Sequence, residues 1–173
     1  MKYKILDCTL RDGGYYNNWL FSKKLTQDYL NAMSKSGIKY IELGFRSPKK
    51  NSYKGPNWYT SEEYLEKLSI PSNLSIGVMV NVFEIVSNSK GIRKTTDLLF
   101  KNVKFSKVKF VRLASHLGEV DSAFKISRIL KNKGYRVAVN LMQISEQSKK
   151  DIIEVGRKAS KSNPDMLYFA DSL

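Results

Sequence analysis

Six short runs of β-branched and apolar residues recur along the chain at nearly even spacing, and this repeat limits the possible folds more than any other feature. The runs are KYKILDCTL, IKYIELGF, LSIGVMV, VKFVRLA, RVAVNLM and MLYFA. Helical patterns separate them, and successive runs begin roughly 30 residues apart, the length of one βαβ crossover. The runs are apolar on both faces, which is typical of parallel strands covered by helices. The sequence therefore predicts a regular α/β array.

Capping residues place several of the helices between these strands. Ser22 is expected to cap a helix that ends at Gly37, where a left-handed residue is needed. Thr60 and Glu63 have the spacing of a capping box, which predicts the start of a second helix. Ser145 is expected to open another helix late in the chain. No linker or low-complexity tract interrupts the array, so we expect one catalytic domain over residues 1–173.

Composition narrows the class of protein. A chain of 173 residues with 42% hydrophobic content can bury one good core. It has no apolar stretch of about 18 residues that would span a bilayer, and its N-terminus lacks the apolar region of a signal peptide, so we expect a cytoplasmic protein without a membrane partner. The single cysteine, Cys8, is expected to pack in the core because free cysteines are mostly buried.

The charge is strongly basic, since 30 Lys and Arg against 16 Asp and Glu give +14. The lysines are spread along helices and loops; the densest groups are Lys49, Lys50 and Lys54 in one loop, and Lys101, Lys104, Lys107 and Lys109 before one strand. These groups are modest beside the basic arm or stripe of a nucleic-acid-binding protein. We expect solvated surface and no specific nucleic-acid partner.

The polar residues at the strand ends favour a TIM barrel over an open doubly wound sheet. Each predicted strand ends close to polar side chains: Arg11 and Asp12, Glu42 and Arg46, Asn81, Ser115 and His116, Asn140 and Gln143, Asp171 and Ser172. In a barrel these ends converge on one pocket, where the catalytic groups lie. A doubly wound sheet would instead concentrate its signal in a GxGxxG turn after the first strand, which is absent here. The fold class expected is an incomplete TIM (β/α)8 barrel with about six βα units.

The segment LDCTLRDGGYYNNW carries the most specific chemistry, because an apolar strand is expected to present Arg11 and Asp12 side by side before Gly13 and Gly14 break it. These two charges could simply neutralise each other as a structural ion pair. Alternatively, Asp12 offers a hard oxygen ligand to Mg²⁺ or Mn²⁺, and Arg11 offers fixed donors to an oxyanion on a substrate. The residues alone leave both interpretations open.

The same segment resembles the first strand of the 4-hydroxy-2-oxovalerate aldolase and HMG-CoA lyase group of divalent-metal TIM-barrel enzymes, in which TLRDG is a signature. IELGF is similar to the second-strand motif of these enzymes, FVRLASH with the following GEVD to the fourth strand of the aldolases, and FADSL to their sixth strand. The similarity is colinear from Lys2 to Leu173. It identifies the chain as similar to the N-terminal portion of such an enzyme.

The resemblance implies a reaction and roles for particular residues. A divalent metal, Mn²⁺ or Mg²⁺, would be bound by Asp12, while Arg11 would stabilise the enolate of a pyruvate-like substrate and Ser172 would hold its carboxylate. The implied reaction is cleavage of a 4-hydroxy-2-oxo acid to a pyruvate-like 2-oxo acid and an aldehyde. Tyr15 stands where the pyruvate aldolases have a catalytic histidine, although an ordinary phenol is a poor base at neutral pH.

The family's paired histidine ligands, an HxH on the next strand, do not occur because His116 is the only histidine. We therefore expect a portion of a longer enzyme, inactive alone, whose missing strands would leave open sheet edges and favour a homo-oligomer.

Four further residues are predicted to bind substrate. Glu42 and Arg112 are expected to pair on the floor of the pocket, because opposite buried charges need partners. Asn140 could bind substrate or satisfy backbone groups, and His116 could act in the site or be a hydrogen-bonded structural group.

Two alternative functions stay open. A Claisen-type acyltransferase, similar to the isopropylmalate and homocitrate synthases, would share the RDG strand. A barrel domain that has lost its catalytic base would keep the fold without the chemistry.

Overall fold

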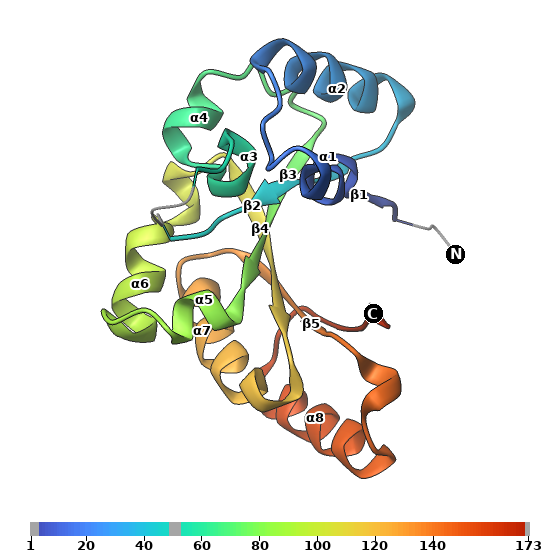
Figure 1. Cartoon of the computed structure of the whole chain (residues 1–173), viewed down its shortest axis with the longest axis vertical. Coiled ribbons are helices and arrows are strands. Elements are labelled where there is room, and N and C mark those ends of the chain that lie inside the picture. Colours follow the sequence, from blue (N-terminus) through green and yellow to red (C-terminus); the bar gives the residue numbers. More distant parts are fainter. Residues whose placement is uncertain (1–3, 49–52, 172–173) are drawn as a thin grey trace. The chain divides into compact units, whose positions relative to one another are not determined.

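The computed structural model describes residues 4–48 and 53–171, and Figure 1 shows their strands and helices alternating along the chain. The six strands lie in the order β1-β2-β3-β4-β5-β6. The pairs β1–β2, β2–β3, β4–β5 and β5–β6 are parallel. A doubly wound sheet reverses its strand order at a switch point, whereas the strands of a TIM barrel follow one another in chain order. The expected α/β class, with six strands of a TIM barrel, is confirmed.

The chain divides into two compact units. The first is Met1–Met79 with Ser106–Lys109, and the second is Val80–Phe105 with Phe110–Leu173. A single catalytic domain over residues 1–173 stays a prediction. Among the described residues, no helix is both long and apolar enough to cross a membrane.

The first unit is built on three strands with short helices on the intervening segments. Its elements are β1 (Leu6–Asp7), α1 (Thr9–Gly13), the 3-10 helix η1 (Gly14–Tyr16), α2 (Lys23–Ser36), β2 (Tyr40–Phe45), α3 (Pro56–Tyr59), α4 (Glu62–Glu66) and β3 (Ser75–Asn81), whose last two residues belong to the second unit. Every residue from 41 to 45 of β2 and from 76 to 80 of β3 is buried. Because side chains alternate between the two faces of a strand, both faces of these strands are covered, as expected of parallel strands.

The second unit begins at the end of β3 and contains the other strands. Its elements are α5 (Val82–Val86), α6 (Gly91–Leu99), η2 (Val103–Phe105), β4 (Val108–Ser115), η3 (Leu117–Glu119), α7 (Val120–Asn132), β5 (Arg136–Leu141), η4 (Ile144–Glu146), α8 (Lys149–Ser162) and β6 (Met166–Phe169). Helix α7 packs on β5 and against both α6 and α8. Ile126 and Leu130 of α7 are fully buried, so this helix supplies much of the apolar core of the unit.

The predicted start and end of the first long helix are confirmed, and two other predicted helix starts are displaced. The Ser22 hydroxyl accepts from the Leu25 N–H to begin α2, and Gly37 ends the helix with φ 81°. Helix α4 is capped by Ser61, one residue after the predicted Thr60. Thr60 is left-handed and ends α3, and its hydroxyl donates to the Asn57 carbonyl oxygen, so it is not available as a cap.

The helix predicted to open at Ser145 begins instead after Ser148, whose side chain accepts from the Asp151 N–H. The hydroxyl of Ser145 donates to the Asp171 carboxylate at 2.5 Å. Both serines precede acidic residues, and the local pattern does not distinguish them.

A glycine allows α3 to lie directly on β2. A Cβ atom on Gly44 would overlap the Asn57 carbonyl oxygen, while the Asn57 side-chain amide donates to the Leu43 carbonyl at 2.9 Å. The register with β3 shifts between Glu42 and Gly44, which is the sign of a β-bulge and is found where a strand redirects side chains. This close packing places Trp58 of α3 over Phe45 of β2, with ring centroids 4.8 Å apart.

Candidate active site

Arg11 and Asp12 lie on a short helix, α1, and not at the end of a strand as predicted. Strand β1 stops at Asp7, whose carboxylate accepts hydrogen bonds from the N–H and the hydroxyl of Thr9. Such side-chain to backbone bonds compete with sheet pairing and favour a turn. The Asp12 N–H then bonds back to the Cys8 carbonyl oxygen, which closes the first helical turn. Cys8 is only half-buried, so its predicted core position is wrong.

Two carboxylates hold the Arg11 guanidinium in place. Its Nε donates to Glu42 Oε1 at 2.8 Å, and its Nη1 pairs with Asp12 Oδ1 at 2.5 Å. The Glu42 side chain is 0% exposed and that of Arg11 is 13% exposed, whereas Asp12 is 60% exposed. Glu42 is therefore the buried anchor of this triad, and Asp12 is its solvent-facing member.

The triad keeps Arg11 charged and leaves part of it free for a ligand. Burial alone would lower the pKa of Arg11, but the Coulombic attraction and hydrogen bond of Glu42 outweigh it, and the pKa is raised above its ordinary value. A guanidinium has five N–H donors in a fixed fork. Among the described residues, the hydrogen bonds and ion pairs of this guanidinium involve only Nε and Nη1. The N–H groups of Nη2 are thus available to an oxyanion.

An aromatic cluster of Tyr15, Trp19, Phe45 and Trp58 packs beside the triad. The Trp19 ring centroid lies 4.8 Å from Tyr15, 5.5 Å from Phe45 and 4.5 Å from Trp58. The Trp19 indole N–H donates to the Arg11 carbonyl oxygen at 2.8 Å. The Arg11 guanidinium carbon lies 5.8 Å from the Phe45 ring centroid, within the range of a cation–π contact. The cluster therefore fixes the backbone and one face of the charged end of Arg11.

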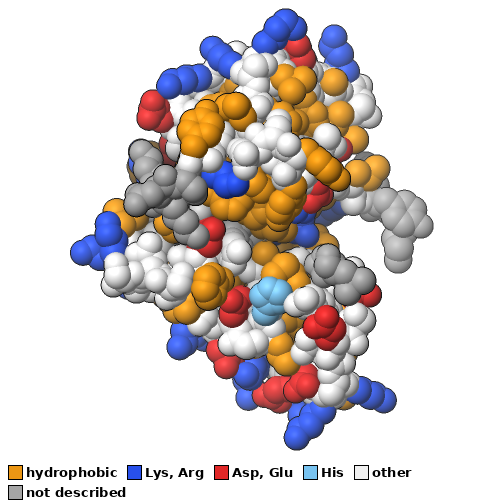
Figure 2. All heavy atoms as spheres, in the orientation of Figure 1, with side chains coloured by type: hydrophobic (Ala, Val, Ile, Leu, Met, Phe, Trp, Pro, Cys, Tyr) orange, Lys and Arg blue, Asp and Glu red, His pale blue; other side chains and the backbone are white. Residues whose placement is uncertain are grey.

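Tyr15 is the outermost ring of this aromatic cluster, with 65% of its surface exposed. It packs edge-on against Trp19 and Phe45. Its place in the site and its catalytic role stay predictions. In the space-filling view, hydrophobic side chains form a continuous area over the part of the first unit that carries α1 and α3 (Figure 2).

Lys54 is a member of this site that the sequence did not single out, because it was grouped with the solvated lysines of its loop. Its ammonium lies 5.3 Å from the Trp19 ring centroid and 5.6 Å from that of Trp58. It also donates to Asn18 Oδ1 at 2.7 Å. Lys49 and Lys50 lie outside the described residues. The sequence contains Trp19, Lys54 and Trp58, but nothing in their spacing predicts that the segment around Trp19 contacts the segment around Lys54.

Arg112, Asn140 and His116 lie in the second unit. Ala114 of β4 pairs in register with Asn140 of β5, and side chains alternate along a strand, so Arg112 projects from the same face as Asn140. The Arg112 guanidinium carbon lies 5.1 Å from the Tyr168 ring centroid, and Tyr168 is the register partner of Asn140. The structure thus brings Arg112 and Asn140 to one face of the β4–β6 sheet.

The other residues predicted to bind substrate differ in where the structure places them. His116 is exposed, and its backbone N–H donates to the Glu119 carboxylate at 3.1 Å at the start of η3; this agrees with its structural interpretation. Ser172 lies outside the described residues. Glu42 and Arg112 lie in different units, so their predicted pairing stays a prediction, and the partner that the structure gives Glu42 is Arg11.

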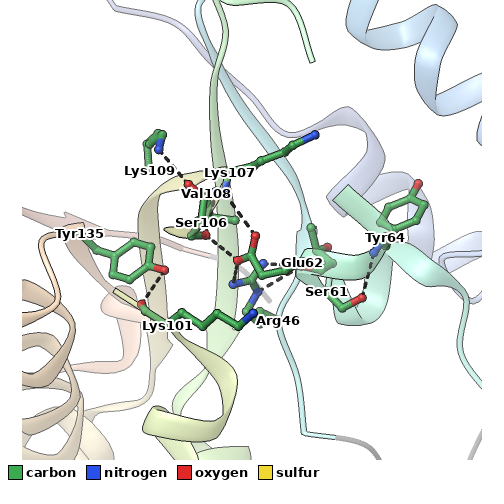
Figure 3. Close-up of polar contacts among 11 residues, drawn as sticks. Arg46, Ser61, Glu62, Tyr64, Lys101, Ser106, Lys107, Val108, Lys109 and Tyr135 are labelled. Carbon is green, nitrogen blue, oxygen red and sulfur yellow. Dashed lines mark hydrogen bonds and ion pairs between the residues drawn. The ribbon is translucent and has the colours of Figure 1, made fainter. Parts of the chain in front are cut away.

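Arg46, also predicted near a strand end, belongs to a buried structural network (Figure 3). Its Nη1 donates to Glu62 Oε1 at 2.8 Å and its Nε donates to the Thr60 carbonyl at 3.1 Å. Glu62 also accepts from the Ser106 hydroxyl at 2.5 Å and from the Lys107 N–H at 3.2 Å. Arg46 therefore ties the segment after β2 to the start of α4 and to the segment before β4.

The described residues do not by themselves fit a complete divalent-metal centre. Asp12 supplies one exposed carboxylate, and it is engaged with Arg11. Across residues 4–48 and 53–171, no three His, Cys, Asp or Glu side chains are grouped as metal ligands. A stable Mg²⁺ or Mn²⁺ site needs several oxygen or nitrogen ligands. Asp12 could thus contribute one ligand to such a site but could not form it alone.

Comparison with known proteins supports the fold. No protein-family model matches the chain, and no curated protein matches it. Among solved structures, it is similar to the N-terminal domain of "a putative aldolase" from Bacteroides vulgatus, with a TM-score of 0.73 and 22% identity over 97% of this chain and 72% of that one. It is also similar to the Bacillus subtilis HMG-CoA lyase, with a TM-score of 0.70 and 11% identity over 98% of this chain and 58% of that one.

These similarities establish the fold. At such low identity they do not establish the reaction. The chain spans just over half of the HMG-CoA lyase that it resembles, in agreement with six of the eight strands of a TIM barrel.

Proposed function

We propose that this chain is part of a carbon–carbon lyase of the aldolase type, which cleaves a 4-hydroxy-2-oxo acid to a pyruvate-like 2-oxo acid and an aldehyde. The observation that carries the proposal is the Arg11 guanidinium, anchored by the fully buried Glu42 and bound to carboxylates of the described residues through Nε and Nη1. The fold shared with an HMG-CoA lyase and with "a putative aldolase" adds support.

Arg11 has the properties that this reaction needs. When the bond between C3 and C4 of the substrate breaks, its electron pair moves onto the 2-oxo group and forms an enolate. A preorganised donor at that oxygen stabilises the charge as it develops. Arg11 is fixed by two carboxylates and one aromatic face, so little reorganisation is required at the moment of cleavage.

The 4-hydroxyl must lose its proton as the aldehyde forms, and the enolate carbon must gain one. Tyr15 is the proposed proton carrier on this side of the site, because its ring packs against the same Phe45 that underlies Arg11. Arg112, Asn140, His116 and Ser172 are proposed to bind the substrate. Asp12 is proposed as one ligand of a divalent metal, Mn²⁺ or Mg²⁺, whose remaining ligands the described residues do not supply.

Several further properties remain proposals of the same kind. A small 2-oxo acid is the proposed partner, the protein is proposed to work in the cytoplasm without specific nucleic-acid or membrane binding, and it is proposed to form a homo-oligomer.

The proposal is tested by incubating the complete gene product and Mn²⁺ or Mg²⁺ with 4-hydroxy-2-oxopentanoate or with 4-hydroxy-2-oxoglutarate, and by measuring pyruvate and the aldehyde product, acetaldehyde or glyoxylate, separately. We expect the two products to appear in equal amounts. If an acyl thioester and a 2-oxo acid are condensed instead, the Claisen-type alternative is correct. If neither reaction occurs with the folded protein, the barrel has lost its chemistry and the proposal is wrong.

A further inference from the structure

Lys54 is held at the edge of the Arg11 site by three neutral groups. Its ammonium faces the rings of Trp19 and Trp58 and donates to the side-chain oxygen of Asn18. A lysine ammonium has three donors, and Asn18 accepts one of them. In the described chain, no carboxylate contacts Lys54.

Five other lysines of this protein are placed differently. Lys24, Lys67, Lys131, Lys133 and Lys158 each form an ion pair with an aspartate or a glutamate. Those pairs neutralise the lysine within the chain. Lys54 has no carboxylate partner among the described residues, although it is half-buried and its ammonium lies against two indole rings. Desolvating a cation has a free-energy cost, and an anionic ligand would offset it.

The segment that carries Asn18 and Trp19 is joined to the segment that carries Gly55 and Trp58 by contacts other than those of the Lys54 side chain. The Gly55 N–H donates to the Asn18 carbonyl oxygen at 2.8 Å, and the Trp19 and Trp58 rings are in contact. Neither of these two contacts involves the Lys54 side chain. The charge of Lys54 is therefore not required to hold the loops together.

The backbone under this group is strained. Asn18 has φ 56° and Trp19 has φ 57°, and a bulky residue such as tryptophan is rarely found in the left-handed region. Strained conformations of this kind cluster at ligand-binding sites. The strained pair presents the Asn18 side chain to Lys54 and the Trp19 indole to Arg11, so one turn connects the two cations.

We propose that Lys54 binds a second anionic group of the substrate, at the end opposite the 2-oxo acid that Arg11 binds. This inference rests on the proposed function and narrows its substrate class to 4-hydroxy-2-oxo acids that carry a distal carboxylate or phosphate. The aromatic rings of Trp19 and Trp58 orient the ammonium, and the remaining two N–H groups donate to the distal anion. Lys54 is thus a specificity residue and takes no part in bond cleavage.

The binding experiment uses the two tryptophans as reporters, because they are the only two in the chain and both contact Lys54. Tryptophan fluorescence of the complete gene product is titrated in Mg²⁺ buffer with three probes of matched length. These are 2-oxopentanoate, which has a distal methyl group, 2-oxoglutarate, which has a distal carboxylate, and 2-oxo-4-phosphonobutanoate, which has a distal phosphonate. The last two probes distinguish carboxylate from phosphate recognition.

We expect the wild-type protein to bind at least one of the anionic probes about tenfold more tightly than 2-oxopentanoate, the gain typical of one charge-assisted hydrogen bond. Lys54→Met, which keeps the length of the side chain, should abolish this preference, and Lys54→Arg should retain most of it. Lys24→Met removes an equal charge from an exposed site in the same unit and should leave the preference unchanged.

The inference is overturned if the wild type binds none of the probes, if it shows no preference, if Lys54→Met retains the preference, or if Lys24→Met also removes it. Circular dichroism of each variant checks that the fold is retained. The cleavage assay is read separately, so the two ideas can fail independently. Turnover without an anion preference would remove the Lys54 inference alone, while an anion preference without turnover would remove the proposed reaction alone.

Discussion

Arg11 Nε donates to Glu42 Oε1 at 2.8 Å across 31 residues of sequence, and the accepting carboxylate is completely buried. This ion pair joins α1 to β2 and determines where the guanidinium points. A buried charge is tolerated only when its partner is present. The position of Arg11 therefore depends on Glu42 more than on the exposed Asp12.

Glu42→Gln should destabilise the protein by about 3 kcal/mol, because loss of one partner leaves the largely buried Arg11 cation incompletely neutralised. The free energy of unfolding in urea measures the effect. The double variant Arg11→Met, Glu42→Gln should recover much of the loss. Glu63→Gln breaks an exposed pair with Lys67 and should change stability by less than about 1 kcal/mol. Equal effects of Glu42→Gln and Glu63→Gln would contradict the anchoring role of Glu42.

The two glycines after Asp12 should respond differently to alanine. A Cβ atom on Gly14 would overlap the Trp19 indole ring, whereas one on Gly13 would meet Phe21 at an ordinary 3.8 Å. Both residues have helical φ and ψ, so backbone strain is not involved. Gly14→Ala should displace Trp19, shift its fluorescence and lower stability, and Gly13→Ala should do neither. Similar spectra for the two variants would show that Trp19 does not depend on Gly14.

Acid should weaken the Arg46–Glu62 network. Burial raises the pKa of Glu62, but hydrogen bonds from Ser106 and Lys107 and the charge of Arg46 outweigh it, and the pKa is lowered from its ordinary value of 4.5. A carboxyl group with a lowered folded-state pKa contributes stability above its unfolded-state pKa, and this contribution is lost as pH falls through the folded-state value.

Unfolding free energies measured between pH 7 and pH 3 should therefore differ for Glu62→Gln. The variant should be less stable than the wild type at pH 7, and the difference should shrink below about pH 4.5. Asp7 and Asp165 also have lowered pKa values, so the variant will still lose some stability in acid. A difference that stays constant over the whole pH range would show that the charge of Glu62 contributes nothing.

Metal binding by this chain alone should be weak, because Asp12 is one carboxylate without grouped partners among the described residues. Calorimetric titration of residues 1–173 with Mn²⁺ should show little heat at micromolar concentrations, and Asp12→Ala should remove what remains. Tight one-to-one binding that survives Asp12→Ala would assign the metal to other residues.

The sequence predicted the fold well because regular features encode it. The spacing of six apolar runs gave the six strands, and Ser22 and Gly37 gave the ends of α2. Predictions failed where two local signals compete. The run KYKILDCTL has the apolar pattern of a strand, but the Asp7 carboxylate bonds the Thr9 N–H and a helix begins at Thr9. Thr60 and Ser61 are both good caps, and the packing of α3 on Gly44 decides between them.

Only those residues of the candidate site that a local pattern marks were predicted from the sequence. Arg11, Asp12 and Glu42 are charged residues next to predicted apolar strands, so the sequence indicated them as site residues. The structure brings the three side chains into contact. Lys54 did not stand out among 30 basic residues. Its role depends on the meeting of two loops 36 residues apart in sequence, and no local pattern reports such a contact.

The most direct test of the proposed reaction is the turnover number of Arg11→Ala, in the complete gene product, for the 4-hydroxy-2-oxo acid that the wild-type protein cleaves. The predicted result is a decrease of about 100- to 1000-fold in kcat, the usual effect of removing one donor to a developing oxyanion, with the circular dichroism spectrum retained. Arg157→Ala, which removes an exposed arginine on α8, should leave kcat unchanged. An unchanged kcat in folded Arg11→Ala would contradict the enolate-stabilising role of Arg11.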